Sequence, residues 1–139
     1  MNIASVVDYA ELHCLSNFSF LRAASHPQEL LQQAHTLGYK ALALTDECSV
    51  AGGVRAYQYK KEQDLNIKLI IGSEFLLKPD QLEAQESIVV LAKNRQGYAQ
   101  LCQLISLARQ RCEKGRYQVY QHDFEELNEC LLIWNPHPN

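Results

Sequence analysis

The feature that most constrains the fold is residues 41–46, where Ala-Leu-Ala-Leu runs directly into Thr45 and Asp46. An unbroken apolar run of this length, followed at once by polar groups, predicts a strand that is buried on both faces. Parallel strands of α/β domains present their chemistry at their carboxyl ends. Asp46 therefore stands where a metal ligand or a general base would stand. On position alone, a carboxylate that caps the next turn is equally well supported.

Composition limits the classes of protein to which the chain can belong. Its 139 residues make one ordinary domain, and 47% apolar residues are enough for a core. The net charge of −3 predicts no global attraction to nucleic acid. The sequence shows neither a charged leader nor a long apolar run, so it predicts no signal peptide and no membrane span. The five cysteines form no C-x-x-C pair, which predicts free thiols in a reducing cytoplasm.

Further patterns predict strands and helices in alternation. Strands are expected at residues 7–15, 41–46, 68–77, 87–92 and 130–134. Helices are expected from Ser25, in a capping box with Gln28, to Gly38, from about Val54 to Gln63, and from Asn94 to Cys112. A polar loop is expected at 79–86, and a short helical turn from Asp123 to Leu127. This order is typical of a parallel sheet or a (β/α) barrel.

The predicted last strand ends close to the end of the chain. A buried strand without a following helix would leave one face and one edge uncovered. We therefore expect residues 1–139 to be a fragment of a longer protein. We also expect the fragment to self-associate through Trp134 and the apolar run 131–133.

Polar side chains gather near the carboxyl ends of three predicted strands. Glu11 and His13 lie in the first, Asp46 and Glu47 end the second, and Glu74 lies late in the third. Carboxylates and an imidazole that converge from separate strands suit a hard or borderline metal ion. Each residue alone has an ordinary structural explanation, such as a hydrogen-bonded histidine or a loop carboxylate. Together they indicate an ancestral metal site.

Three separated segments carry a family resemblance. They are Tyr-Ala-Glu-Leu-His-Cys-Leu-Ser-Asn-Phe-Ser-Phe-Leu from Tyr9, Ala-Leu-Thr-Asp-Glu-Cys-Ser from Ala43, and Ile-Ile-Gly-Ser-Glu-Phe from Ile70. In order and in spacing they resemble the polymerase and histidinol phosphatase (PHP) domain. More closely, they resemble the N-terminus of the error-prone C-family bacterial DNA polymerases. The resemblance covers essentially the whole chain.

The resemblance implies an α/β fold at the head of a much longer polymerase. The expected architecture is a partial, distorted (β/α)₇ TIM-like barrel, truncated after about five strands, with residues 1–139 forming the N-terminal part of the PHP domain. Barrels of this family bind up to three metal ions. The resemblance matches His13, Asp46 and Glu74 to metal-binding positions, with Glu11 and Glu47 as secondary candidates.

The chain departs from the family pattern at three positions. Active members carry histidines where this chain has Leu15 and Glu47, and Arg22 adds positive charge to the first loop. Leucine has no lone pair to donate, and arginine repels a cation. We therefore expect a vestigial site with no catalytic residues and no firmly bound cofactor. At most it would hold Zn²⁺, Mn²⁺ or Mg²⁺ weakly.

The expected function is that of a largely structural PHP-type domain in an error-prone DNA polymerase. The resemblance implies a parent that acts in damage-induced mutagenesis, translesion synthesis and DNA repair, and that binds DNA in the cytoplasm. The fragment alone is not expected to catalyse, to bind DNA strongly or to associate with membranes. Two alternatives stay open: an active metal-dependent phosphoesterase or 3′–5′ exonuclease, and an interaction module for repair or replication proteins.

Two further features bear on contact with nucleic acid. Four basic residues crowd the end of the helix predicted from Asn94: Arg109, Arg111, Lys114 and Arg116. Cations are favourable at a helix carboxyl end, so we favour a solvent-exposed helix end over a phosphate contact. Phe18 and Phe20 lie in the first loop, and for them we favour a packed loop over a base-stacking platform.

Overall fold

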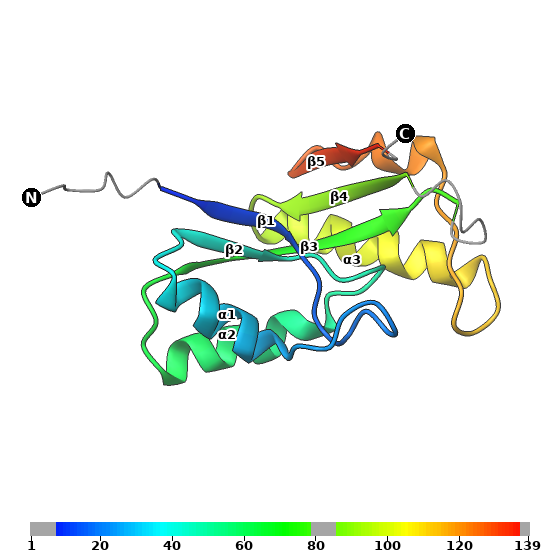
Figure 1. Ribbon diagram of the computed structural model, residues 1–139. Helices are drawn as coiled ribbons and strands as arrows, with labels where there is room; N and C mark the ends of the chain where they lie inside the picture. Colours follow the sequence, from blue (N-terminus) through cyan, green and yellow to red (C-terminus); the bar gives the residue numbers. More distant parts are fainter. Residues whose placement is uncertain (1–7, 79–85, 137–139) are drawn as a thin grey trace, which may run out of the picture.

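The fold is a five-stranded sheet with helices packed against it. A computed structural model describes residues 8–78 and 86–136 (Figure 1). The strands are β1 (Ala10–Cys14), β2 (Ala41–Leu44), β3 (Lys68–Leu76), β4 (Ser87–Ala92) and β5 (Cys130–Asn135), in that spatial order. The helices are α1 (Pro27–Thr36), α2 (Ala51–Glu62) and α3 (Arg95–Gln110), with a 3₁₀ turn, η1, at Gln121–Phe124. Among the described residues, no helix is both long enough and apolar enough to cross a membrane.

β2 is the buried strand that the apolar run predicts. All four of its residues are buried, and so are Thr45 and Asp46 directly after it. Leu42 and Leu44 pack with side chains of α1 and α2, whereas Ala43 packs with β4 on the other face. Because β2 is parallel to both β1 and β3, the carboxyl ends of these three strands meet at one edge.

The sheet is parallel only in its first half, which corrects the expectation of a parallel sheet. β4 runs antiparallel to β3, and β5 runs antiparallel to β4. A parallel crossover needs a dozen or more residues, and the chain between Leu76 and Ser87 is too short for one. Leu77 N donates to Glu86 O at 2.9 Å instead, at the base of a hairpin. The predicted polar loop 79–86 lies, except for Glu86, outside the described residues.

The predicted start of the first helix is wrong by a small shift. The sequence pairs Ser25 with Gln28, but the helix begins at Pro27 and His26 is its N-cap. The backbone N–H of His26 donates to Glu29 Oε2 at 2.8 Å. Ser25 and His26 are thus two adjacent candidates for the N-cap position. Proline at the first helical position favours the later of the two.

The start of α3 and the end of α1 agree with the local signals, whereas the start of α2 does not. Asn94 caps α3, and its side chain accepts from Gly97 N at 2.9 Å. Gly38 follows α1 with φ of +78°, the left-handed conformation that glycine adopts readily. α2 begins at Ala51, earlier than the predicted Val54.

Gly97 is required by a close approach of two backbone segments. A Cβ at this position would collide with the carbonyl oxygen of Glu129, just before β5. Alanine usually stabilises a helix interior over glycine by about 1 kcal/mol. Here Gly97→Ala is expected to destabilise the protein by about 2 kcal/mol, because the backbone of one segment must move. Urea unfolding would measure this, with the exposed Ser106→Ala in the same helix as control. A Gly97→Ala protein as stable as the wild type would contradict the expectation.

β5 is more exposed than the buried strand that the sequence predicts. Leu131, Leu132 and Trp134 are 55%, 45% and 62% exposed. The turn before the strand also begins earlier than predicted, at Gln121. Within the described ranges β5 pairs with β4 alone, so its outer edge forms no ladder there. Self-association through this strand stays a prediction.

Candidate functional site

The predicted site residues lie at one end of the sheet. His13 is in β1, Asp46 and Glu47 follow β2, and Glu74 lies near the end of β3. Glu47 and Glu74 form an isolated parallel bridge, and Glu74 N donates to Asp46 O at 3.1 Å. The expectation that residues 41–46 and 68–74 form adjacent parallel strands, with His13 at the same end, is confirmed.

Glu74 is a buried carboxylate that contacts two side chains, those of Arg22 and His13. Its side chain is 2% exposed, Arg22 Nη1 donates to its Oε2 at 2.6 Å, and His13 Nε2 lies 3.3 Å from its Oε1. Burial by itself raises the pKa of Glu74. Hydrogen bonds from His13 and Arg22, together with the charge of Arg22, outweigh burial and lower the pKa to about 2. Glu74 is therefore ionised at neutral pH.

Arg22 pairs with two of the predicted metal ligands. Its Nη1 also donates to Glu47 Oε2 at 3.3 Å, so one guanidinium nitrogen contacts both Glu47 and Glu74. Burial alone would lower the pKa of Arg22, but hydrogen bonds and charges of the two carboxylates raise it. The sequence reasoning treated Arg22 only as a charge that repels cations. It missed the ion pairs, for which the spacing in the chain offers no signal.

Asp46 is bound by the loop that follows β1. Its Oδ1 accepts from Ser16 N and Ser19 Oγ, and its Oδ2 accepts from Ser16 Oγ, all at 2.7 Å. The carboxylate is 2% exposed, and both of its oxygens are satisfied in this way. Asp46 therefore anchors the loop. Sequence reasoning missed both serines, although a Ser-x-x-Ser spacing directly after a strand was a readable signal.

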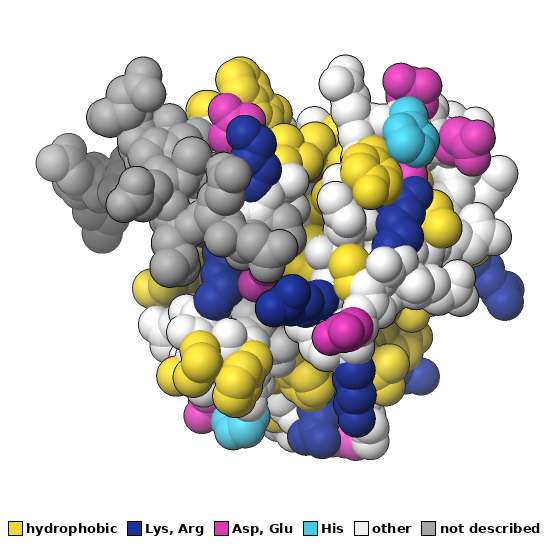
Figure 2. Space-filling model, turned by 90° about the vertical axis from the view of Figure 1, so that its right-hand side faces the viewer, with side chains coloured by type: hydrophobic (Ala, Val, Ile, Leu, Met, Phe, Trp, Pro, Cys, Tyr) yellow, Lys and Arg dark blue, Asp and Glu magenta, His cyan; other side chains and the backbone are white. Residues whose placement is uncertain are grey.

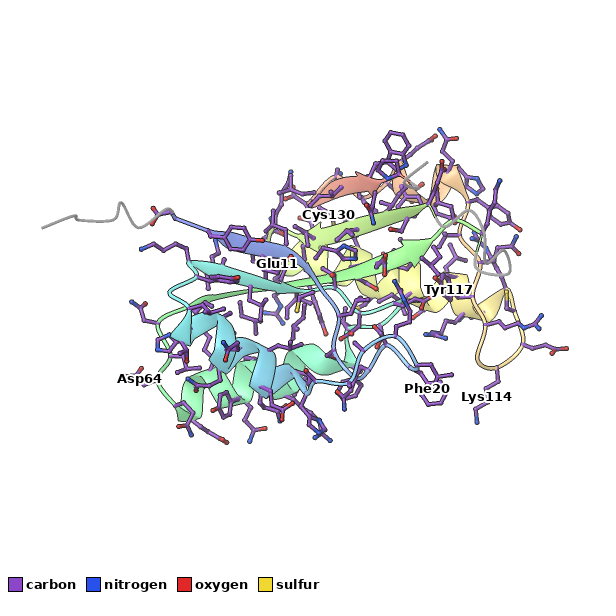
Figure 3. All side chains as sticks on the ribbon, viewed as in Figure 1. Glu11, Phe20, Asp64, Lys114, Tyr117 and Cys130 are labelled. Atoms are coloured by element: carbon purple, nitrogen blue, oxygen red, sulfur yellow. The ribbon has the colours of Figure 1, made fainter. Side chains whose placement is uncertain are left out.

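Tyr117 reaches this end of the sheet from the segment after α3 (Figure 3). Its hydroxyl donates to Glu47 Oε1 at 2.8 Å and accepts from Leu76 N at 2.9 Å. Burial, with the nearby charge of Glu47, raises the pKa of Tyr117 and keeps the hydroxyl protonated. Tyr117 thus holds the Glu47 carboxylate in place opposite Arg22. Nothing in the sequence pattern singled it out.

Glu11, a secondary candidate, bonds only to near neighbours in the chain among the described residues. Its carboxylate accepts from His13 N at 2.9 Å and from Tyr9 Oη at 3.0 Å. Figure 3 shows it nearer the middle of the sheet than Tyr117. The described residues contain no group of three or more histidine, cysteine or acidic side chains arranged to hold a metal ion.

The residues as arranged do not fit a resident metal ion. Arg22 already donates to one carboxylate oxygen each of Glu47 and Glu74, and the serines already donate to both oxygens of Asp46. A metal ion would have to displace these donors before it could use the carboxylates. The weakly held Zn²⁺, Mn²⁺ or Mg²⁺ expected from the sequence stays a prediction.

Comparison with known proteins shows that the chain is similar to PHP domains and to part of the error-prone DNA polymerases. A family model for the PHP domain matches residues 11–135. The chain is 54% identical over 128 residues to an error-prone DNA polymerase of Vibrio vulnificus, covering 92% of this chain and 12% of the relative. It is 51% identical over 141 residues to the error-prone DNA polymerase of Dechloromonas aromatica, covering 97% of this chain and 13% of the relative. The match is to the N-terminal region of such polymerases, so the chain spans a small part of their length.

Two solved structures share the fold. One, from Bifidobacterium adolescentis, is designated a metal-dependent phosphoesterase; it has a TM-score of 0.55 and 20% identity, covering 76% of this chain and 35% of that one. The other is an amidohydrolase from Chromobacterium violaceum with bound sulfate and no metal; it has a TM-score of 0.55 and 23% identity, covering 73% and 33%. These matches confirm the α/β fold as a five-stranded half-barrel consistent with a truncated TIM-like barrel.

Proposed function

The chain belongs to the PHP domain family, and from this premise we propose that it is a structural, non-catalytic domain of an error-prone DNA polymerase. Identity of about half of its residues to proteins of that name supports the assignment. The proposed parent is a nucleotidyltransferase that copies damaged DNA in translesion synthesis, repair and induced mutagenesis. It would act in the cytoplasm, with DNA as substrate and with other repair or replication proteins as partners.

The observation that carries the non-catalytic role is the position of Arg22. Its Nη1 lies 2.6 Å from Glu74 Oε2 and 3.3 Å from Glu47 Oε2. A guanidinium supplies the positive charge that these carboxylates need for burial. It cannot activate a water molecule or bind the attacking and leaving oxygens of a phosphoester as metal ions do. The same residues therefore stabilise the fold without supporting metal-assisted hydrolysis.

The contacts of this region support a structural role because they join segments far apart in the chain. Asp46 fastens the loop after β1, Arg22 fastens that loop to β3, and Tyr117 fastens the segment after α3. Each link is buried or half-buried, and each uses a charged or strongly polar group. Such links favour one arrangement of loops over others, because an alternative would leave a charge unpaired.

Metal analysis and a nuclease assay would test the proposal. After dialysis the chain is expected to carry no stoichiometric Zn²⁺ or Mn²⁺, and to show no EDTA-sensitive cleavage of single-stranded DNA or p-nitrophenyl phosphate with added Mn²⁺. His13→Ala should change neither result, and His35→Ala serves as the matched histidine control. Stoichiometric metal together with cleavage that EDTA and His13→Ala both abolish would replace the proposal with an active phosphoesterase.

A further inference from the structure

The loop between β1 and α1 presents two large apolar side chains to solvent. Phe20 is 85% exposed and Leu21 is 89% exposed, so the expectation of a packed loop is wrong for its tip. Figure 3 shows Phe20 at the outer end of this loop, pointing away from the sheet. Single exposed apolar residues are common, but an adjacent pair at a protruding tip is a candidate contact surface.

The tip is held in one conformation. Leu21 has φ of +61°, a backbone conformation that a branched residue adopts only where neighbouring contacts impose it. Arg22 N donates to Ser19 O at 3.0 Å, and Ser19 N donates to Ser16 O at 2.9 Å. Ser19 is in turn bonded to Asp46, as described above. The backbone on both sides of Phe20 is therefore hydrogen-bonded before any partner arrives, which lowers the entropy cost of ordering the loop on binding.

Two arginine side chains lie near the loop. The Arg55 guanidinium of α2 lies 5.8 Å from the ring centroid of Phe18. The Arg109 guanidinium donates to Cys48 O at 2.9 Å, and the neighbouring Glu47 N donates to Ser19 Oγ at 3.0 Å, which links Arg109 to the loop through residues 47 and 48. Both arginines are exposed at the residue level.

Basic side chains are prominent among the exposed groups at this end of the molecule (Figure 2). Asp46 and Glu74 are each 2% exposed, so their negative charges are recessed; Asp46 is hydrogen-bonded by serines and Glu74 is paired with Arg22. Lys114 lies at the same end as Phe20 in Figure 3. Figure 2 views this end directly and shows Lys and Arg side chains spread across it beside exposed hydrophobic ones, with Asp and Glu side chains scattered among them. An anionic partner is therefore favoured here, although the whole chain carries a net charge of −3.

We propose that the Phe20–Leu21 tip, with Arg55 and Arg109, is a contact site for single-stranded nucleic acid. A base would stack on Phe20, and backbone phosphates would pair with the two arginines. Aromatic platforms beside cations are the usual means of binding single strands without sequence preference. A stable protein partner is less suited, because it needs about 800 Å² from each side and the tip offers two side chains. The site involves no hydrolysis and does not depend on the polymerase assignment.

Fluorescence anisotropy with a labelled oligothymidine of about 12 nucleotides would test the tip. Phe20→Ser/Leu21→Gly is expected to weaken binding about tenfold, because each stacked base contributes that much or more. Glycine suits the left-handed backbone at position 21, so the variant should fold normally, which urea unfolding would verify. Leu37→Ala, at the other end of α1 and also exposed, is the matched control and should bind like the wild type.

The charges are tested separately through the salt dependence of binding. Arg55→Gln is expected to weaken binding and to reduce the slope of log affinity against log salt by about 0.7. Lys68→Gln, at the start of β3 and away from the tip, should leave the slope unchanged. An unchanged slope in Arg55→Gln would overturn the phosphate contact.

Three results would overturn the proposal as a whole. They are no oligonucleotide binding by the wild type, equal binding by Phe20→Ser/Leu21→Gly, and an equal loss in Leu37→Ala. If light scattering instead shows self-association that the tip substitutions abolish, without oligonucleotide binding, the tip is a contact between copies of this chain. Weakened binding in the tip variant alone, with unchanged unfolding, supports the proposal.

Discussion

Replacing Arg22 with methionine is expected to destabilise the protein by about 3 kcal/mol at pH 7. The substitution removes the shorter of the two contacts to Glu74, whose side chain is 2% exposed, and leaves His13 as the remaining partner. Removing one member of a buried ion pair leaves an uncompensated charge in a poorly solvated place. The expected loss lies at the low end of the usual range because Arg22 itself is 33% exposed. Urea unfolding in reducing buffer is the measurement.

The effect of Arg22→Met should depend on pH in a defined direction. The folded-state pKa of Glu74, about 2, lies below its ordinary value of 4.5. Ionised Glu74 therefore contributes stability that is fully present above pH 4.5 and is lost as the pH falls through about 2. Without Arg22, only His13 opposes the effect of burial, so the pKa of Glu74 is higher than in the wild type and its contribution is lost at a higher pH. The difference between variant and wild type should be largest near neutrality and smaller by about pH 3.

Two further variants of this chain serve as controls for the Arg22 experiment. Arg55→Met removes an exposed arginine that pairs with no carboxylate of residues 8–78 or 86–136, and it is expected to change stability by less than about 0.5 kcal/mol. In Arg22→Met/Glu74→Gln the unpaired charge is gone, so part of the lost stability should return. The proposed role of Arg22 would be rejected if Arg22→Met unfolded at the wild-type urea concentration and kept the wild-type pH profile.

Combining Leu15→His and Glu47→His with Arg22→Ala is expected to raise Zn²⁺ affinity on the order of a hundredfold or more. Removing a residue that hydrogen-bonds to a metal ligand typically lowers metal affinity about 10- to 100-fold. Adding direct ligands should change the affinity at least as much. Leu15 follows His13 by two residues, a spacing that places side chains on one side of an extended chain. Removing the guanidinium frees Oε2 of Glu74, which Arg22 now binds.

Competition with a chromophoric zinc chelator would measure the gain. Leu15→His/Glu47→His with Arg22 retained should bind more tightly than the wild type but less tightly than the triple variant. Two histidines at exposed positions elsewhere, Leu37→His and Glu62→His, control for added imidazole alone. Circular dichroism would verify folding, because Glu47→His also removes the acceptor of the Tyr117 hydroxyl. A triple variant no tighter than wild type would show that these positions do not converge on one ion.

The sequence predicted helix ends and the buried strand well where the signal involves only a few neighbouring residues. Asn94 caps α3 through Gly97, three residues on, and Gly38 ends α1 with a positive φ. The run 41–44 is buried throughout, because an unbroken apolar segment can be accommodated only between two layers. The least certain local signal was the cap of α1, where adjacent residues competed. These features depend on energies within one or two turns, which the order of residues already contains.

The sequence also predicted which end of the sheet would hold the polar cluster. Strand periodicity was enough to bring His13, Asp46 and Glu74 to neighbouring strand ends, because parallel strands share a direction. Strand periodicity was not enough to predict the direction of β4, which the length of the preceding connection decides. It was also not enough to predict the exposure of Phe20. Exposure depends on what the rest of the chain leaves uncovered.

Only the tertiary structure decided what the polar cluster does. Arg22 and Glu74 are 52 residues apart in the chain, and Tyr117 and Glu47 are 70 apart. No periodicity relates such positions, and a carboxylate has the same residue name whether it faces a metal ion, a serine or an arginine. The free energy of a buried charge depends on the few atoms within hydrogen-bond distance. Those atoms come from separate loops, so their identity follows from the packing of the whole domain.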